Sequence, residues 1–214
     1  DLEWETSVQE AEATCALEAG DLDRCATALD ELDASVRAMI GSQRALEATQ
    51  RLGLLGRFSD SARLREDLTS IRLARATTAA EQATITSDAW RSASSQRGQM
   101  LLERLRVRDA KANAALDPAT LRDRLEPGEL MIDYAFGRTE TIGYVASAKA
   151  GIRRVKLGNT VAIESDIRAF IDVVSSKSSA LNETQQLQIA QRLASALIQP
   201  LVAVSLTWPS CLEE

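Results

Sequence analysis

Histidine, on which most acid–base and nucleophilic sites rely, does not occur among the 214 residues of this chain. Ser-His-Asp and Cys-His arrangements therefore have no general base here, and a metal site has no imidazole ligand. The sequence also holds no glycine-rich loop of the dinucleotide-binding or Walker type. It therefore assigns no catalytic, cofactor-binding or metal-binding residue.

Three cysteines remain as candidate nucleophiles: Cys15, Cys25 and Cys211. Their number is odd, and no pair has the Cys-x-x-Cys spacing. Cys15 and Cys25 lie in apolar helical stretches, so we interpret them as small core residues. Cys211 lies beside Glu213 and Glu214, which would raise the pKa of its thiol, so it is a poor nucleophile. Cysteine usage of this kind predicts a reducing, cytoplasmic location.

Neighbouring acidic residues give no catalytic pair. Glu66-Asp67 and Glu213-Glu214 are adjacent in sequence, so on a helix their side chains point apart. Asp133 alternates with apolar residues in a predicted strand, and we expect it on a solvated face; it would matter more if it were buried.

Composition and charge limit the class of protein. Apolar residues make up 45% of the chain and aromatic residues only 4%, which favours close-packed helices over an aromatic-rich β-sandwich. Residues 1–35 contain eleven Asp and Glu but a single basic residue, Arg24. Such a surface repels phosphate backbones, so we predict no nucleic-acid partner. One basic cluster is read as the solvated face of a helix; it comprises Arg97, Arg104, Arg106, Arg108 and Lys111.

The sequence shows neither a signal peptide nor an apolar run that approaches the length of a membrane span, so we predict no membrane partner. The chain begins at Asp1 rather than at Met. We therefore expect a fragment of a longer protein.

Helical patterns with glycine breaks fill residues 1–116. We predict a helix over 2–17 that ends at Ala19-Gly20, and a second over 22–39 that Asp21 caps. Further breaks are expected at Gly41-Ser42 and at Gly56, after which Ser59 or Asp60 caps another helix. From Ile71 to about Leu116 the chain stays helical, with an interruption near Thr86–Asp88 or at Gly98. Trp90 is interpreted as a packing anchor.

The breaks at Gly20 and Gly56 resemble each other at a spacing of 36 residues, close to the period of tetratricopeptide (TPR) helix pairs. In each, a large apolar residue follows two positions later (Leu22, Phe58) and a small one five positions later (Cys25, Ser61). TPR-like helical hairpins are the favoured interpretation. A generic helical bundle is the alternative.

The period of the apolar residues changes to two between residues 125 and 158. Leu130–Phe136 alternates, Gly137–Glu140 supplies a turn, and Thr141–Ser147 is a second run of strand formers. Ala150-Gly151 turns the chain again into the alternating Ile152–Leu157. Three short strands with tight turns predict an antiparallel meander, which must pack its apolar face on something else.

Helices flank this meander. Asp117-Pro118 opens a short one, Thr160 is expected to cap the next, and a polar loop over 175–181 follows. Asn182 or Thr184 then caps a last helix that ends at Pro200. Leu201–Leu206 is expected to begin a buried strand. The predicted fold is α+β and mostly helical, with a helical domain over 1–116 and a second domain over 117–214.

This order of elements resembles the opening of the CHAT domain, the caspase-like domain associated with tetratricopeptide repeats. The resemblance extends from Leu121 to Leu201. It rests on the Pro-Gly-Glu-Leu-Met-Ile-Asp-Tyr segment (127–134), on the hairpin, on a third strand that ends in Val-Lys-Leu (155–157), and on two helices that end in Leu-Ala-Ser-Ala-Leu-Ile-Gln-Pro-Leu (193–201). The family is named for its association with tetratricopeptide repeats, and a TPR-like pattern lies upstream of this segment.

The resemblance implies a cysteine peptidase in which a His and a Cys at separate strand ends cleave a protein substrate. Those strands would follow Leu201, so no catalytic residue is carried over to this chain. The expected function is the non-catalytic N-terminal portion of a TPR–CHAT peptidase. In this view the helical arm binds a protein partner or a regulatory segment, and the catalytic half lies elsewhere. The alternatives are a stand-alone helical scaffold and a pseudoenzyme.

Overall fold

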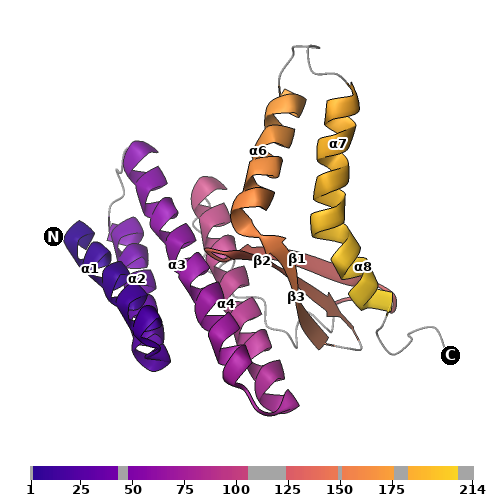
Figure 1. Cartoon of the computed structure of the whole chain (residues 1–214). Helices are drawn as coiled ribbons and strands as arrows, with labels where there is room; N and C mark the ends of the chain where they lie inside the picture. Colours follow the sequence, from indigo (N-terminus) through magenta and orange to yellow (C-terminus); the bar gives the residue numbers. More distant parts are fainter. Residues whose placement is uncertain (1, 43–47, 106–123, 149–150, 176–182, 207–214) are drawn as a thin grey trace. The chain divides into compact units, whose positions relative to one another are not determined.

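The structure, a computed structural model, describes residues 2–42, 48–105, 124–148, 151–175 and 183–206 (Figure 1). The chain divides into two compact units, which we call the helical unit (Asp1–Asp117) and the sheet unit (Pro118–Glu214). The fold is mostly helical with one three-stranded antiparallel sheet, so the predicted α+β class is confirmed at this level.

Four helices form the described part of the helical unit: α1 (Leu2–Ala19), α2 (Leu22–Ser42), α3 (Ala48–Arg75) and α4 (Ala79–Leu105). Each helix packs against the next one in the chain, and α1 also packs against α3. Packing of this kind buries the sides of each helix that face its neighbours and leaves the remaining side exposed.

The turn between α1 and α2 forms as predicted. Gly20 has a φ of +76°, its N–H donates to the Leu17 carbonyl, and the Asp21 N–H donates to the Ala16 carbonyl. This is a Schellman C-terminus, for which glycine is the favoured residue. The Asp21 carboxylate then accepts the N–H of Arg24 at 3.1 Å, so Asp21 is the N-cap of α2.

The predicted break at Gly56 is wrong. Helix α3 continues from Ala48 to Arg75, with Gly53, Gly56, Ser59 and Asp60 inside it. Glycine in a helix interior costs only about 1 kcal/mol relative to alanine, which the packing of a long helix can offset. The second turn of the 36-residue pattern therefore does not form, and Gly20 and Gly56 are not equivalent.

The chain turns instead between α3 and α4, at Thr77-Thr78. The Glu81 N–H donates to the Thr78 hydroxyl, and the Thr78 N–H donates to the Glu81 carboxylate, both at 3.1 Å. This reciprocal pair is a capping box, a start signal that the sequence contains and that our prediction missed. The predicted interruptions at Thr86–Asp88 and Gly98 are wrong, because α4 runs through both.

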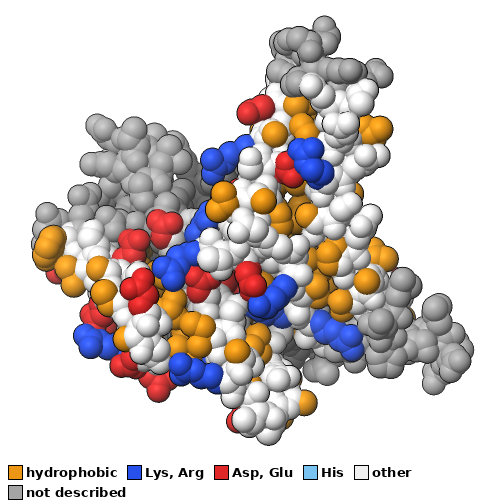
Figure 2. Space-filling model, in the orientation of Figure 1, with side chains coloured by type: hydrophobic (Ala, Val, Ile, Leu, Met, Phe, Trp, Pro, Cys, Tyr) orange, Lys and Arg blue, Asp and Glu red, His pale blue; other side chains and the backbone are white. Residues whose placement is uncertain are grey.

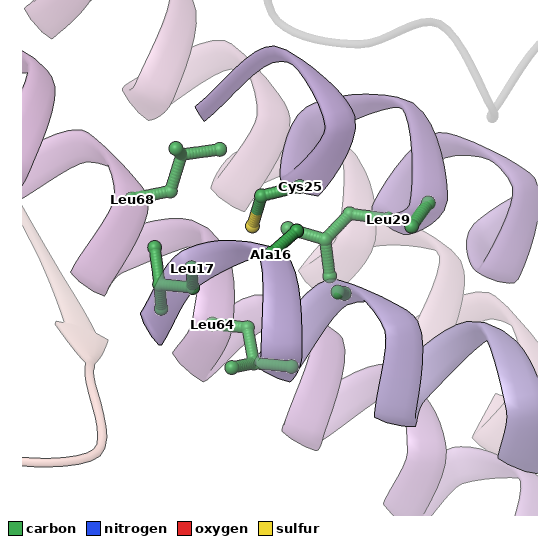
Figure 3. Packing of buried hydrophobic residues seen from close by; sticks show 8 residues of the cluster. Ala16, Leu17, Cys25, Leu29, Leu64 and Leu68 are labelled. Carbon is green, nitrogen blue, oxygen red and sulfur yellow. The ribbon is translucent and has the colours of Figure 1, made fainter. Parts of the chain in front are cut away.

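Small and aliphatic side chains form the core between α1, α2 and α3 (Figure 3). Its buried members are Ala13, Ala16, Leu17, Cys25, Ala28, Leu29, Leu64 and Leu68. The alanines and Cys25 let the helices approach closely, and Leu29 fills the space between them. Cys25 is therefore a core residue as predicted, whereas Cys15 is exposed, so the prediction for Cys15 is wrong. The predicted packing anchor on α4, Trp90, is fully buried.

The predicted meander is confirmed. Strands β1 (Leu130–Phe136), β2 (Glu140–Ser147) and β3 (Gly151–Asn159) pair antiparallel in the order β1-β2-β3. The predicted turn between β1 and β2 is closed by a hydrogen bond from the Gly137 N–H to the Glu140 carbonyl at 2.9 Å. Strand β2, the central one, is buried along nearly its whole length.

One face of the sheet has room for a helix because β2 carries a glycine. A Cβ on Gly143 would lie 2.6 Å from Cδ2 of Leu201 and 3.3 Å from Cδ1 of Leu157. Leu201 is fully buried there, in a cluster with Val145, Leu157 and Ile163. Tyr134 lies opposite Gly143 on β1 and packs against the same cluster.

Helix α6 (Thr160–Ser175) follows β3 directly. Its cap is Asn159, whose side-chain oxygen accepts the Ala162 N–H at 3.0 Å, and not Thr160 as predicted. Thr160 is the first helical residue: its N–H donates to the Thr139 carbonyl, and its hydroxyl lies 3.3 Å from that of Thr141. These bonds fix the start of α6 against the β1–β2 turn.

The last helix does not end at Pro200. Helix α7 (Glu183–Leu193) passes through a π-helical turn, η2 (Ala194–Ile198), into α8 (Gln199–Leu206). The Gln199 N–H donates to the Ala194 carbonyl five residues back, so one extra residue is accommodated just before the proline. Proline is tolerated where its missing N–H costs no helical hydrogen bond. The predicted strand over Leu201–Leu206 is therefore wrong, since α8 occupies it.

Several predictions lie outside the described residues. These are the short helix opened by Asp117-Pro118, the polar loop predicted over 175–181 apart from Ser175, the cap at Asn182, and Cys211 with its neighbouring glutamates. Ser175 ends α6, and Thr184, the alternative cap, lies inside α7. The side chains of the basic cluster that begins at Arg97 also lie outside them.

Candidate interaction surfaces

The residues singled out for chemistry do not come together. Asp133 on β1 is half-buried opposite Tyr144 of β2, and its neighbour Tyr134 points to the other face of the sheet. Glu66 is buried and Asp67 is half-buried on α3. Within the described ranges, no group of three or more Cys, Asp or Glu side chains could hold a metal ion. The other candidate sites in the described ranges are surfaces.

Exposed apolar side chains gather on the sheet unit. Of the eleven large apolar side chains exposed in the described part of the chain, nine belong to this unit. We call these nine the open apolar surface: Leu130, Ile132, Val161, Phe170, Ile171, Val174, Leu187, Ile198 and Val202. Surface apolar residues are ordinary when scattered, and these nine lie on several elements and on more than one face of α6; a contiguous group of them marks a contact site.

The apolar stripe of α6 continues beyond the sheet that covers it. Ile163, Ile167, Phe170 and Val174 follow a helical spacing and lie on one face. The first two pack into the core over the sheet, whereas Phe170 is 38% exposed and Val174 is 68% exposed. Helices α6 and α7 rise side by side from the sheet, so their far ends lie past it (Figure 1). Figure 2 shows hydrophobic side chains along both helices.

An open groove of about 670 Å³ lies between α6 and α7 where they meet the end of β3. Leu157, Ile163 and Ala196 give it an apolar floor. Asp166 on α6 and Arg192 on α7 line it and form a bidentate ion pair, with Nη2–Oδ1 at 2.7 Å and Nε–Oδ2 at 3.1 Å.

The electrostatics of this ion pair favour the charged forms. The hydrogen bond from Arg192 lowers the pKa of Asp166, and the same bond raises the pKa of Arg192. Ser195, within the π-helical turn, lies on the rim beside Gln188 and Gln191. The groove is therefore lined by both polar and apolar side chains.

The helical unit contains a buried polar cluster between α2 and α3. Asp33 is only 3% exposed, yet it accepts the Ser61 hydroxyl at 2.7 Å and the Arg65 guanidinium at 2.8 Å. The same Arg65 nitrogen also reaches the exposed Asp30 at 2.8 Å. Buried charges of this kind need their partners, so the cluster fixes how α2 and α3 sit together.

A second, smaller groove of about 200 Å³ lies between α2, α3 and α4. Charged side chains of both signs line it, among them Asp30, Arg65, Arg72 and Asp88. Arg72 also donates to the Leu22 carbonyl. This groove is the candidate contact surface of the helical arm.

One described helix, Thr184–Val204, is long and apolar enough to span a membrane by length and composition alone. The expectation that no run approaches this length is therefore corrected. The segment contains five glutamines and Arg192, which are costly in lipid. The signal is weak evidence for a span.

The described residues thus form a mostly helical α+β protein. Comparison with models of known protein families, with curated proteins and with solved structures finds no match to this chain.

Proposed function

We propose that this chain is the non-catalytic N-terminal portion of a TPR–CHAT caspase-like cysteine peptidase, in which a further polypeptide covers the sheet unit. The observation that carries the proposal is the open apolar surface. We infer that a layer with these apolar side chains uncovered is unfinished, because apolar surface removed from water stabilises a fold by about 25 cal/mol per Å².

The order of elements supports the same proposal. A hairpin, a third strand and two helices follow one another, as in the opening of the CHAT domain. Because α8 occupies Leu201–Leu206, any further strand of the proposed domain starts after Leu206. The His and Cys of the proposed peptidase would lie in that part, since this chain contains no histidine.

In this proposal the helical unit binds a protein partner or a regulatory segment. The mixed charges of the groove between α2, α3 and α4 support a polar, peptide-like contact there. The acidic side chains of α1 and α2 disfavour a nucleic acid. A cytoplasmic location is part of the proposal, supported by Cys15 and Cys25, which are thiols rather than disulfide partners.

Hydrogen exchange tests the covering of the sheet unit. The backbone amides of α6 and α7 should exchange faster in this chain alone than in the protein made from its complete reading frame. The helices α1 and α2 serve as the internal reference, since their exchange should not change. Equal exchange of α6 and α7 in both proteins would contradict the proposal.

A stand-alone helical scaffold is the second candidate, and the mixed-charge groove between α2, α3 and α4 favours it. A scaffold binds its partner through the helical unit without any completing chain. Substitutions in the groove of that unit, such as Arg72→Glu, would then abolish partner binding, while α6 and α7 would exchange equally in the two proteins.

A further inference from the structure

The two outer strands of the sheet differ in charge. Strand β3 carries three basic residues, Arg153, Arg154 and Lys156, whereas the only charged residue of β1 is Asp133. Charged side chains, especially lysine, protect an edge strand from pairing with another chain. By this criterion β3 is a protected edge and β1 is not.

The register of the hairpin shows which backbone groups of β1 face outward. Gly137 and Glu140 form a hydrogen-bonded pair at the turn, and the ladder from there to Leu130 and Ser147 has no irregularity. Because hydrogen-bonded and non-hydrogen-bonded pairs alternate along an antiparallel ladder, Ala135, Asp133 and Met131 bond to β2. The N–H and C=O groups of Ile132 and Leu130 therefore point away from β2.

The side chains of these same two residues are exposed. Leu130 is 44% exposed and Ile132 is 43% exposed, on the sheet face where Tyr134 and Phe136 pack into the core. The outward backbone groups and the uncovered side chains thus belong to one short segment. An apolar strand with low charge and no proline favours strand addition.

We propose that two copies of this chain pair through β1, antiparallel and centred on Ile132, to form one continuous sheet across a twofold axis. In this register Ile132 lies opposite Ile132 of the second copy, and Leu130 lies opposite Tyr134 of the second copy. Both are hydrogen-bonded pairs, as the outward backbone groups require. Aromatic and branched cross-strand pairs of this kind stabilise a sheet.

Neighbouring registers are less favourable. Centring the pair on Asp133 would place two carboxylates directly opposite each other, which is destabilising. Centring it on Met131 would leave Tyr134 without a partner residue from the other strand. Because β1 is complementary to itself in this register, its expected partner is a second copy of the chain rather than an unrelated strand.

The first test measures the mass of the chain over a range of concentrations by light scattering and sedimentation. We expect a dimer that Ile132→Lys weakens by about tenfold or more. The matched control is Ile152→Lys, which makes the same change on β3 and should leave the dimer intact. Circular dichroism of both variants separates loss of pairing from loss of folding.

A disulfide test reads the register. The Cα atoms of a hydrogen-bonded pair lie about 5.5 Å apart, which suits a disulfide. In a Cys15→Ser, Cys211→Ser background, Ile132→Cys should therefore oxidise to a covalent dimer, whereas Asp133→Cys should not. A monomer at all concentrations, a dimer indifferent to Ile132→Lys, or open-ended oligomers would each overturn the proposal. Leu130 and Ile132 also belong to the open apolar surface, but the exchange of α6 and α7 tests the proposed function separately from this pairing.

Discussion

Asp30 and Asp33 offer a carboxylate to the same nitrogen of Arg65 at the same distance of 2.8 Å, but their surroundings differ. The side chain of Asp30 is 74% exposed and that of Asp33 is 4% exposed. Water already satisfies an exposed carboxylate, whereas a buried cluster depends on its internal partners. Burial should therefore decide how much each carboxylate contributes to the free energy of unfolding.

We expect Asp33→Ala to lower the free energy of unfolding by about 2–4 kcal/mol, because it leaves Ser61 and Arg65 without a buried partner. Asp30→Ala is the matched control and should cost less than about 1 kcal/mol. Urea unfolding followed by circular dichroism measures both. Equal losses in the two variants would contradict the role given to burial.

The ion pair between Asp166 and Arg192 should make stability depend on pH. Arg192 holds the pKa of Asp166 below its ordinary value of 3.8, so the folded state binds the proton less readily than the unfolded state. This contribution is present above the ordinary pKa and is lost as the pH falls through the lowered one.

The free energy of unfolding of Asp166→Asn should accordingly lie below that of the parent chain at neutral pH, and the difference should vanish in acid. Urea unfolding at a series of pH values measures it. Asp172→Asn, an exposed position on the same helix, is the control. A difference that persists unchanged in acid would show that the ion pair does not cause it.

Elements show where local sequence signals succeed. The turn at Gly20 combines a glycine with positive φ and a capping aspartate, so two independent signals coincide. Gly56 is also a glycine, but Arg57 rather than a capping residue follows it, and the helix continues through it. The Thr78–Glu81 capping box marks the start of α4, but the prediction placed helix boundaries at glycines and missed it.

The two glycines should respond in opposite ways to alanine. Gly20→Ala should destabilise the helical unit by about 1–2 kcal/mol, because φ is positive there. Gly56→Ala should stabilise it by about 0.5–1 kcal/mol, since alanine is the better helix former. Thermal unfolding measures both. Destabilisation by both substitutions would indicate a turn at Gly56 and restore the 36-residue repeat.

The strands were predicted more closely than the surfaces. A period of two fixes which residues share a face, so the meander follows from the sequence. The pairing of Asp166 with Arg192, 26 residues apart, depends on how α6 packs against α7. Likewise, periodicity marks Ile163 and Val174 alike as inward residues, but only the structure shows that the sheet covers the first and not the second.

At the scale of the whole molecule, the helical unit has a continuous core, whereas the sheet unit leaves apolar side chains on α6, α7, α8 and β1 uncovered. We propose that another polypeptide covers these side chains, which would explain the asymmetry. The proposal of a caspase-like peptidase then requires that the missing part supply a histidine and a reactive cysteine.

The most direct measurement is the coding sequence that follows the codon for Glu214. The account predicts that it continues, with a strand followed by His-Gly and a later strand followed by Cys. A stop codon directly after Glu214 would contradict the account and leave a scaffold without catalysis.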